Sequence, residues 1–142
     1  ALPISLHLEH INIHEVLDHC LMVSGSSFAR HLIIQRDFDP SLPAISADRD
    51  LLIQLFLNLF KNASEATKQN DSLLVKTSYA LSTPHSASNQ YGLNQLPLQI
   101  DIIDTGSGIS PELQGYVFEP FISNKLNGSG LGLVINSNCQ KY

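Results

Sequence analysis

Apolar and polar positions follow two different periods along the chain, and these periods predict its helices and strands. Two stretches have the three- and four-residue spacing of an amphipathic helix. The first runs from Asn12 to about Arg30, and the second begins at Ser46 or Asp48 and continues to about Lys68. Shorter stretches with the character of strands lie at residues 31–38, 72–81 and 96–103. A last helix is expected at residues 131–140.

Caps, turns and loops mark where these elements end. Asn12, with Glu15 three residues later, is a capping box at the start of the first helix. Residues 39–43 carry two prolines and predict a turn, and residues 82–94 are polar and predict a loop. Glycine and proline are crowded beyond Asp104. The order of elements predicts one α+β domain over residues 1–142, a two-layer α/β sandwich with helices on one face of the sheet.

Composition narrows the class of protein further. The chain has 142 residues, 43% of them hydrophobic and 15% charged, which is typical of one folded domain. Its net charge of -5 argues against a nucleic-acid groove. Cys20 and Cys139 are too few for a disulfide framework or a zinc site. Without a membrane-length apolar run, we expect a reduced, soluble, cytoplasmic domain, and its ends indicate a piece of a longer chain.

The first candidate motif lies on the second predicted helix, at Asn58-Leu59-Phe60-Lys61-Asn62-Ala63-Ser64-Glu65-Ala66. Asn58 and Asn62 are four residues apart and share one face of that helix. Amide oxygens suit a hard cation such as Mg²⁺, and the small Ala63 and Ala66 leave room for a flat group. Two surface asparagines on an amphipathic helix would give the same pattern, so both interpretations stay open for this motif alone.

Two further motifs are rich in glycine. Asp104-Thr105-Gly106-Ser107-Gly108-Ile109 follows an apolar strand, where a carboxylate can accept a hydrogen bond from a ligand amino group. An ordinary Asp-Gly turn is the alternative. Gly128-Ser129-Gly130-Leu131-Gly132-Leu133 leads into the last predicted helix, whose free amides could receive phosphate oxygens. This motif is neither the dinucleotide fingerprint nor a Walker loop.

In this order the motifs resemble those of the ATP-binding catalytic domain of sensor histidine kinases, in the superfamily shared with gyrase, Hsp90 and MutL. Residues 58–66 are similar to the N box, 104–109 to the G1 box, 118–121 to the F box and 128–133 to the G2 box. Residues 12–19, 36–43 and 123–125 and the long loop resemble the nitrogen-regulation kinases of the NtrB group. The resemblance implies a Bergerat-type fold, a mixed sheet with three helices on one face, here without the family's C-terminal strands.

The resemblance also implies the ligands, ATP and Mg²⁺, and the residues that bind them. Asn62 would hold the Mg²⁺ that bridges the ATP phosphates, with Asn58 beside it as the second catalytic residue. Asp104 would accept the adenine amino group. Further nucleotide contacts would come from the base pocket, the lid and the phosphate loop: Ala66, Gly106, Gly108, Ile109, Phe118, Lys125, Gly128, Gly130, Leu131 and Gly132.

Three features of the sequence differ from the family pattern or distinguish between branches of the superfamily. ATP-hydrolysing relatives place a glutamate four residues before the magnesium asparagine as general base, whereas this chain has Asn58, which takes up no proton at neutral pH. This favours transfer to histidine over hydrolysis. Glu65 stands where many histidine kinases have a basic residue. His14-Glu15 lacks the Asn-Pro end of a phosphoacceptor motif, so we expect the acceptor histidine outside this chain.

The sequence therefore predicts the ATP-binding domain of a two-component sensor histidine kinase. It would deliver the γ-phosphoryl of Mg-ATP to a histidine on its own dimerisation domain, and the isolated piece would be inactive. An NtrC-type response regulator and a PII-type protein are partners by resemblance, and a homodimer through an exposed sheet edge is a further expectation. A nucleotide-binding or partner-docking module without catalysis, and an anti-sigma-factor-type serine kinase, remain the alternatives.

Overall fold

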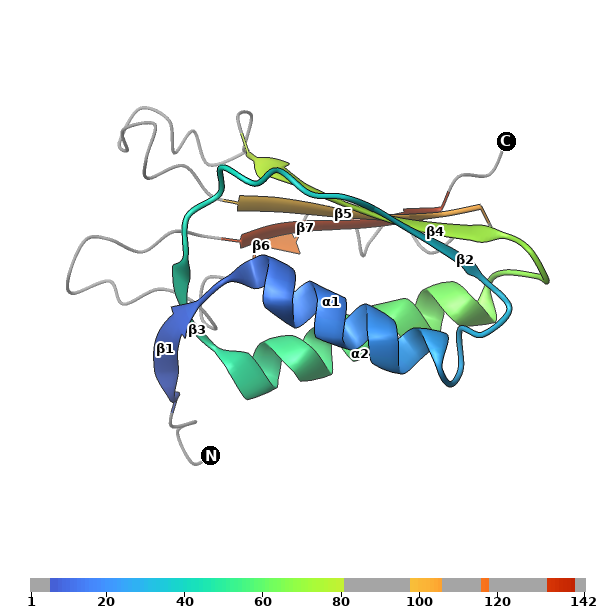
Figure 1. Ribbon diagram of the computed structural model, residues 1–142, viewed down its shortest axis with the longest axis horizontal. Coiled ribbons are helices and arrows are strands. Elements are labelled where there is room, and N and C mark those ends of the chain that lie inside the picture. Colours follow the sequence, from blue (N-terminus) through green and yellow to red (C-terminus); the bar gives the residue numbers. More distant parts are fainter. Residues whose placement is uncertain (1–5, 81–97, 106–115, 118–132, 140–142) are drawn as a thin grey trace.

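The computed structural model describes residues 6–80, 98–105, 116–117 and 133–139, and the structural statements below concern these residues. In chain order the elements are β1 (Leu8–Ile11), α1 (Ile13–Gly25), β2 (Ile33–Asp37), β3 (Ile45–Asp48), α2 (Arg49–Glu65), β4 (Ser72–Tyr79), β5 (Leu98–Asp104), β6 (Tyr116–Val117) and β7 (Leu133–Cys139). Figure 1 shows their arrangement. The short strands β1 and β3 were not expected, because four residues are too few to establish a period.

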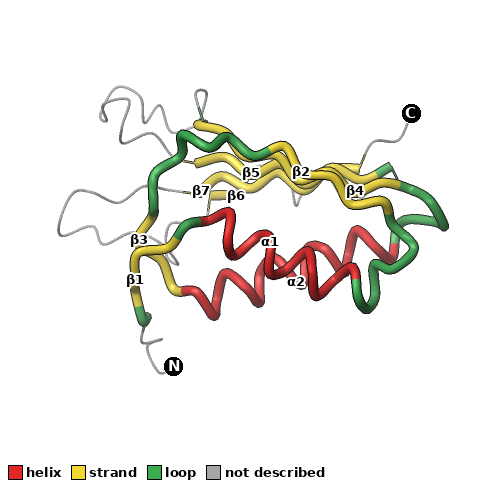
Figure 2. Tube along the Cα trace, in the orientation of Figure 1, coloured by secondary structure: helices red, strands yellow, loops and turns green. Residues whose placement is uncertain are grey.

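The described residues form two layers, a five-stranded sheet and two helices that lie side by side on one of its faces (Figures 1 and 2). The strand order is β2-β4-β5-β7-β6. The pairs β2–β4 and β5–β7 are parallel, whereas β4–β5 and β6–β7 are antiparallel, so the sheet is mixed. Strands β1 and β3 form a separate antiparallel ribbon at the end where both helices begin. The predicted two-layer sandwich is confirmed.

Both helices begin at a residue whose side chain caps the free backbone amides. Asn12 accepts a hydrogen bond from the backbone N–H of His14 at 2.9 Å and is the predicted N-cap, whereas the described hydrogen bonds do not include the return bond from Glu15 that a capping box has. Asp48 caps α2, accepting from the N–H of Leu51 at 3.2 Å through one oxygen and from the N–H of His7 at 3.0 Å through the other. These hydrogen bonds hold the pKa of Asp48 below its ordinary value. The carboxylate thus ties the start of α2 to the chain before β1.

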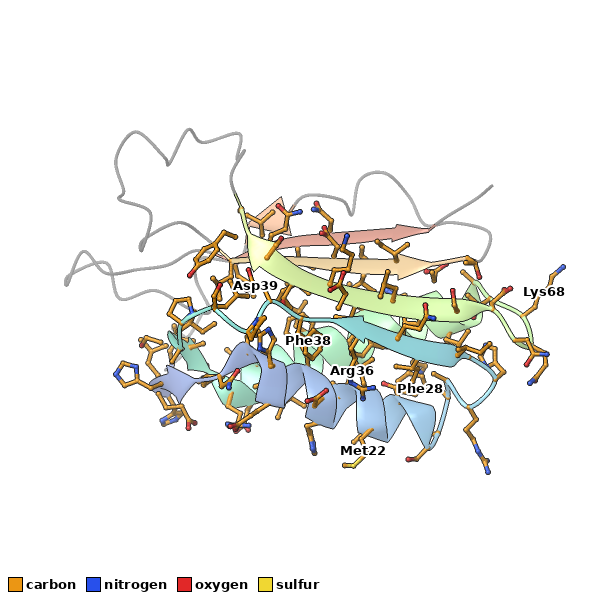
Figure 3. The ribbon with its side chains drawn as sticks, turned by 45° about the horizontal axis from the view of Figure 1, so that its top comes forward. Met22, Phe28, Arg36, Phe38, Asp39 and Lys68 are labelled. Atoms are coloured by element: carbon orange, nitrogen blue, oxygen red, sulfur yellow. The ribbon has the colours of Figure 1, made fainter. Side chains whose placement is uncertain are left out.

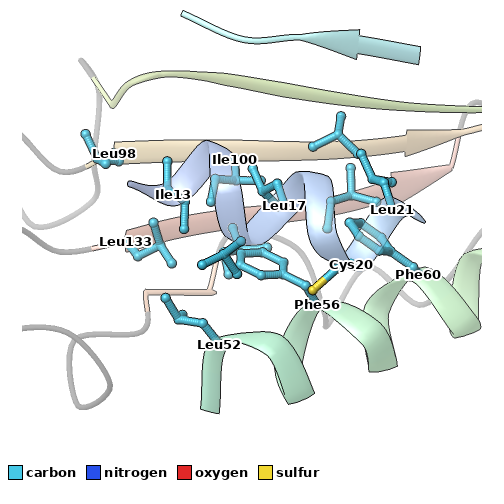
Figure 4. Packing of buried hydrophobic residues seen from close by; sticks show 14 of the residues in the cluster. Ile13, Leu17, Cys20, Leu21, Leu52, Phe56, Phe60, Leu98, Ile100 and Leu133 are labelled. Carbon is cyan, nitrogen blue, oxygen red and sulfur yellow. The ribbon is translucent and has the colours of Figure 1, made fainter. Parts of the chain in front are cut away.

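The hydrophobic core lies between the helices and the sheet. Leu17 and Cys20 of α1 and Phe56 and Phe60 of α2 pack with Ile100 of β5 and its neighbours (Figure 4). Burial raises the pKa of the Cys20 thiol to about 11, so it stays protonated at neutral pH. Neither helix in the described part of the chain has the length and apolar character to cross a membrane.

The prediction of a last helix at residues 131–140 is wrong for Leu133–Cys139, which form strand β7 between β5 and β6. The physical reason is that this segment combines β-branched residues with asparagines, which are weak helix formers. Leu133 and Ile135 belong to the core, whereas Asn136 donates to Asp101 at 2.7 Å on the other face of the sheet. β7 pairs with β5 along its full length. The described residues therefore contain two helices rather than the expected three.

Candidate functional site

The last two turns of α2 present the two asparagines predicted as catalytic residues. Asn58 and Asn62 are both exposed, whereas Phe56, Phe60 and Ala63 of the same helix are buried. Within the described residues, neither amide has a hydrogen-bond partner. Their oxygens are therefore available to a ligand, and as uncharged oxygen ligands they suit a hard cation such as Mg²⁺. The described part of the chain contains no cluster of histidine, cysteine and carboxylate side chains that could hold a metal ion instead.

Asp104 is the last residue of β5 and is only 2% exposed. It follows Leu98, Ile100 and Ile102 on the face of β5 that packs against the helices, because every second residue of a strand lies on the same face. The carboxyl group therefore lies at the rim of the core, on the helix side of the sheet. A carboxylate in so enclosed a position must be hydrogen-bonded or paired to offset the cost of its burial.

Asn62 and Asp104 come from elements that meet at the same end of the sandwich (Figure 1). The segment 66–71, here called the α2–β4 connection, leads from the end of α2 to the start of β4. At that point Thr105 and Ser72 exchange two hydrogen bonds: the Ser72 N–H donates to Thr105 Oγ1 at 3.1 Å, and the Thr105 N–H donates to the Ser72 carbonyl at 3.3 Å. The end of β5 is thereby fixed to the chain that leaves α2.

His31 fixes the other side of the α2–β4 connection. Its Nε2 lies 3.2 Å from the carbonyl oxygen of Ser64 and 3.0 Å from Oγ1 of Thr67. Its carbonyl accepts from the N–H of Asn70 at 2.9 Å. Asn70 has a φ of 71°, a left-handed conformation that asparagine tolerates better than most residues. The end of α2 is therefore anchored by hydrogen bonds from a loop that is distant in sequence.

Few charged side chains of the described residues lie near the end of α2, and those few are exposed. Lys61 and Glu65 lie on the exposed side of α2, and Lys68 extends from the α2–β4 connection (Figure 3). The backbone N–H of Lys68 donates to the carboxylate of Asp71 at 2.7 Å, which closes the turn. The described part of the site therefore relies on amides, one buried carboxylate and backbone groups.

The remaining predicted contacts lie outside the described residues. Asn58, Asn62, Ala66 and Asp104 are described, and Ala66 is the half-buried C-cap of α2. The predicted residues that fall outside are Gly106, Gly108, Ile109, Phe118, Lys125, Gly128, Gly130, Leu131 and Gly132.

A second polar cluster surrounds His14, near the start of α1. Its Nε2 lies 2.8 Å from Thr77 Oγ1, and its ring stacks on Phe38 at a centroid distance of 4.6 Å. The same Thr77 oxygen accepts from the N–H of Asp39 at 2.9 Å. Burial lowers the pKa of His14, although the charges of Asp18 and Asp39 act in the opposite direction. This cluster joins α1, β4 and the turn after β2, where Figure 3 labels Phe38 and Asp39, and it leaves His14 half-buried.

Sequence reasoning did not single out His31 or Thr105. Both act on partners 33 residues away in the chain, which no local pattern reveals. The available signal was the pair of hydroxyl residues Ser64 and Thr67 at the end of α2, since such residues often form hydrogen bonds with helix carbonyls.

The sequence matches the family described as "Histidine kinase-, DNA gyrase B-, and HSP90-like ATPase" over residues 47–141. This range begins within β3, extends past β7 and includes the segments of all four predicted motifs.

Individual relatives agree with this match, and a solved structure has a similar fold. The chain is 42% identical over 130 residues to the sensory histidine kinase/phosphatase NtrB of Rhodobacter capsulatus, covering 92% of this chain and 36% of that protein. It is also 42% identical over 127 residues to the protein of the same name from Rhizobium meliloti, covering 88% and 33%. The chain thus spans about a third of the length of these curated relatives. The catalytic domain of histidine kinase ThkA has a similar fold, with a TM-score of 0.57 at 17% identity over 77% of this chain and 66% of that chain.

Proposed function

Because the chain belongs to the family of histidine kinase-, DNA gyrase B- and HSP90-like ATPases, as its motifs predicted, we propose that it is the ATP-binding domain of a two-component sensor histidine kinase of nitrogen regulation. The observation that carries the proposal is that two kinds of group lie on elements that end at the same end of the sandwich. These are the exposed amides of Asn58 and Asn62, which have no hydrogen-bond partner among the described residues, and the buried carboxylate of Asp104.

Asp104 is proposed to bind the base. A buried carboxylate accepts hydrogen bonds and cannot donate them when ionised. It therefore favours the exocyclic amino group of adenine and disfavours the carbonyl oxygen that guanine has at the same position. In the G1 box, Gly106, Gly108 and Ile109 are proposed to complete the pocket around the base.

Asn62 is proposed to hold Mg²⁺ through its amide oxygen, with Asn58 one turn earlier on the same side of α2. When bound, Mg²⁺ neutralises charge on the phosphate oxygens. The chain itself has a net charge of -5 and supplies few cations for that purpose. Lys125 and the backbone amides of Gly128, Gly130, Leu131 and Gly132 are proposed as the other phosphate contacts.

The proposed reaction is transfer rather than hydrolysis. A nitrogen of the acceptor imidazole attacks the γ-phosphorus, a P–N bond forms, and the bond to the β–γ bridging oxygen breaks so that ADP leaves. Asn58 stands where a hydrolytic relative has its glutamate, and an amide cannot take a proton from water at neutral pH. We therefore propose negligible ATPase activity in the isolated chain.

The partners are also proposals, since the chain spans only about a third of its relatives. The acceptor would lie on the dimerisation domain of the same protein, in the cytoplasm. An NtrC-type response regulator and a PII-type protein would act on the whole kinase. Homodimerisation through a sheet edge would use β2 or β6, the outer strands of the described sheet.

One observation favours a second candidate, a nucleotide-binding or docking module without catalysis. Residues 133–139 form strand β7, whereas the sequence predicts a helix after the G2 box. A phosphate loop that leads into a strand rather than a helix would preserve nucleotide binding but lose phosphoryl transfer.

The proposal is tested by binding and transfer with a matched pair of variants. Asp104→Asn removes the buried carboxylate, and Asp101→Asn makes the same change on the opposite face of the same strand. Calorimetry with a non-hydrolysable ATP analogue and Mg²⁺ is expected to show roughly tenfold or greater weakening for Asp104→Asn. Asp101→Asn should bind like the unaltered chain.

Two results would contradict the proposal. Equal binding by the Asp104→Asn variant would remove the adenine contact, and no binding by the unaltered chain would reject nucleotide binding altogether. Mixing the chain with a separate phosphoacceptor domain and γ-labelled ATP then separates the two candidates. Labelled phosphohistidine supports the kinase, and binding without label supports the module without catalysis.

A further inference from the structure

His31 reaches from the loop before β2 to the end of the helix that carries Asn62. Its Nε2 faces two oxygens, the Ser64 carbonyl at 3.2 Å and Thr67 Oγ1 at 3.0 Å. The carbonyl can only accept, and the Thr67 hydroxyl already donates its hydrogen to that same carbonyl at 2.9 Å. Since both neighbours offer His31 acceptor lone pairs, Nε2 carries a hydrogen and donates to both. The hydrogen bonds thus fix the role of this nitrogen as a donor.

The end of α2 depends on such a donor. The last carbonyls of a helix have no partner inside the helix, and α2 does not end on a glycine that would turn the chain back on them. Its C-cap, Ala66, has φ and ψ of -93° and 2° and donates only to nearby carbonyls such as that of Ala63 at 3.2 Å. The hydroxyls of Ser64 and Thr67 also bond within the same turn. Among the described residues, His31 is the side chain that reaches this turn from another element.

We propose that His31 is a positioning residue of the nucleotide site, an inference that rests on the function proposed above. It touches no ligand itself. By holding the Ser64 carbonyl it fixes the last turn of α2, and with it the amide of Asn62 two residues earlier. Thr105, through Ser72, fixes the end of β5 and therefore Asp104. The α2–β4 connection thus has two independent anchors, one on the magnesium side and one on the adenine side.

Two independent anchors predict two separable effects on binding. His31→Leu keeps a side chain of moderate size but removes the donor, so it should weaken the Mg²⁺-dependent part of ATP-analogue binding by roughly tenfold. Thr105→Val keeps the shape but removes the hydroxyl acceptor, so it should weaken the binding of adenosine measured without Mg²⁺. A general loss of packing would lower both affinities together in either variant.

The experiment measures both ligands by calorimetry for the unaltered chain, His31→Leu, His31→Gln and Thr105→Val, with circular dichroism to check folding. His31→Gln retains an N–H donor at similar reach and should restore most of the Mg²⁺-dependent affinity. In the Asn62→Ala background, His31→Leu should cause little further loss, because His31 acts through Asn62.

Several outcomes would overturn the inference while leaving the proposed function in place. These are His31→Leu binding like the unaltered chain, equal loss with and without Mg²⁺, no rescue by His31→Gln, or additive losses with Asn62→Ala. Failure of the unaltered chain to bind the ATP analogue is a different result: it rejects the proposed function and, with it, the site that His31 would position.

Discussion

The two helices bury similar faces and begin with similar caps, but they use their polar residues differently. On α1, His14 forms a hydrogen bond with Thr77 of β4. Asp18 forms an ion pair with Arg36 of β2, with Oδ1 and Nε 2.6 Å apart. Polar side chains of α1 therefore join this helix to the sheet. On α2, Asn58 and Asn62 are exposed and have no hydrogen-bond partner in the described part of the chain. Thus α1 has polar side chains that bond to the sheet, whereas α2 carries two asparagines without a partner among the described residues.

This difference separates a stabilising role from a binding role. Polar groups that are paired within the protein contribute to the folded state and leave little for a ligand. The amides of Asn58 and Asn62, exposed and without a partner among the described residues, contribute little to folding and are open to a ligand. The comparison therefore assigns α1 to the scaffold and the last two turns of α2 to the proposed site.

The largest expected effect concerns what the helices share, their buried faces. Leu17→Ala on α1 and Phe56→Ala on α2 both remove side chains that are 0% exposed. Each should lower the free energy of unfolding, by about 2–5 kcal/mol for the leucine and about 3–5 kcal/mol for the phenylalanine. Urea denaturation measures both. A loss below about 1 kcal/mol for either would contradict the shared core on which the comparison depends.

A smaller effect should distinguish α1 through the pH dependence of stability. Burial lowers the pKa of His14 from its ordinary 6.5, so as the pH falls below that value the unfolded chain takes up the proton more readily than the folded chain. The contribution of His14 to stability is therefore complete above pH 6.5 and is lost as the pH falls toward the lowered pKa.

The variant His14→Gln removes this titration but keeps a polar group near Thr77. Its unfolding free energy, measured between about pH 5 and 7.5, should vary less with pH than that of the unaltered chain. His19→Gln, which changes an exposed histidine of the same helix, is the matched control. If both variants reduce the pH dependence of the unfolding free energy equally, the enclosure of His14 is not the cause of that dependence.

The smallest effect on stability is expected at the open amides of α2. Asn58→Ala and Asn62→Ala remove exposed groups without partners in the described residues, and alanine has the higher helix propensity. The unfolding free energy should stay within about 0.5 kcal/mol of the parent value while Mg²⁺-dependent nucleotide binding weakens but remains measurable. Thermal unfolding without ligand, paired with calorimetry, tests both parts. Marked destabilisation would show that these amides stabilise the folded state, as the paired side chains of α1 do, and would contradict their assignment to a binding role.

Local patterns predicted the parts of the fold that local forces determine. The cap at Asn12, a start of α2 at Ser46 or Asp48, the buried stripe of α2 and the strand before Asp104 can all be read from neighbouring residues. Segment 133–139 could not, because its strand is stabilised by pairing with β5, more than 30 residues earlier in the chain. This pairing acts together with the weak helix formers of the segment, and both favour a strand over the predicted helix.

The candidate site divides in the same way. Asn58, Asn62 and Asp104 were predicted from their motifs, because the residues that would touch a ligand are grouped in sequence. The anchors His31 and Thr105 were not, because each bonds to a residue that only the folded chain brings near. Sequence therefore indicates the proposed binding groups, and structure shows what holds them in place.

The position of Asp104 on β5 has a consequence for how this strand can change. Gln99, Asp101 and Ile103 alternate with the buried Ile100, Ile102 and Asp104, so substitutions at the outer three leave the core intact. Loss or gain of a single residue within β5 would instead exchange the two sets, turning Ile103 inward and the carboxylate outward. The core and the proposed base contact thus depend on the same alternation of side chains along β5. The length of β5 is therefore more tightly constrained than the identity of its outer side chains.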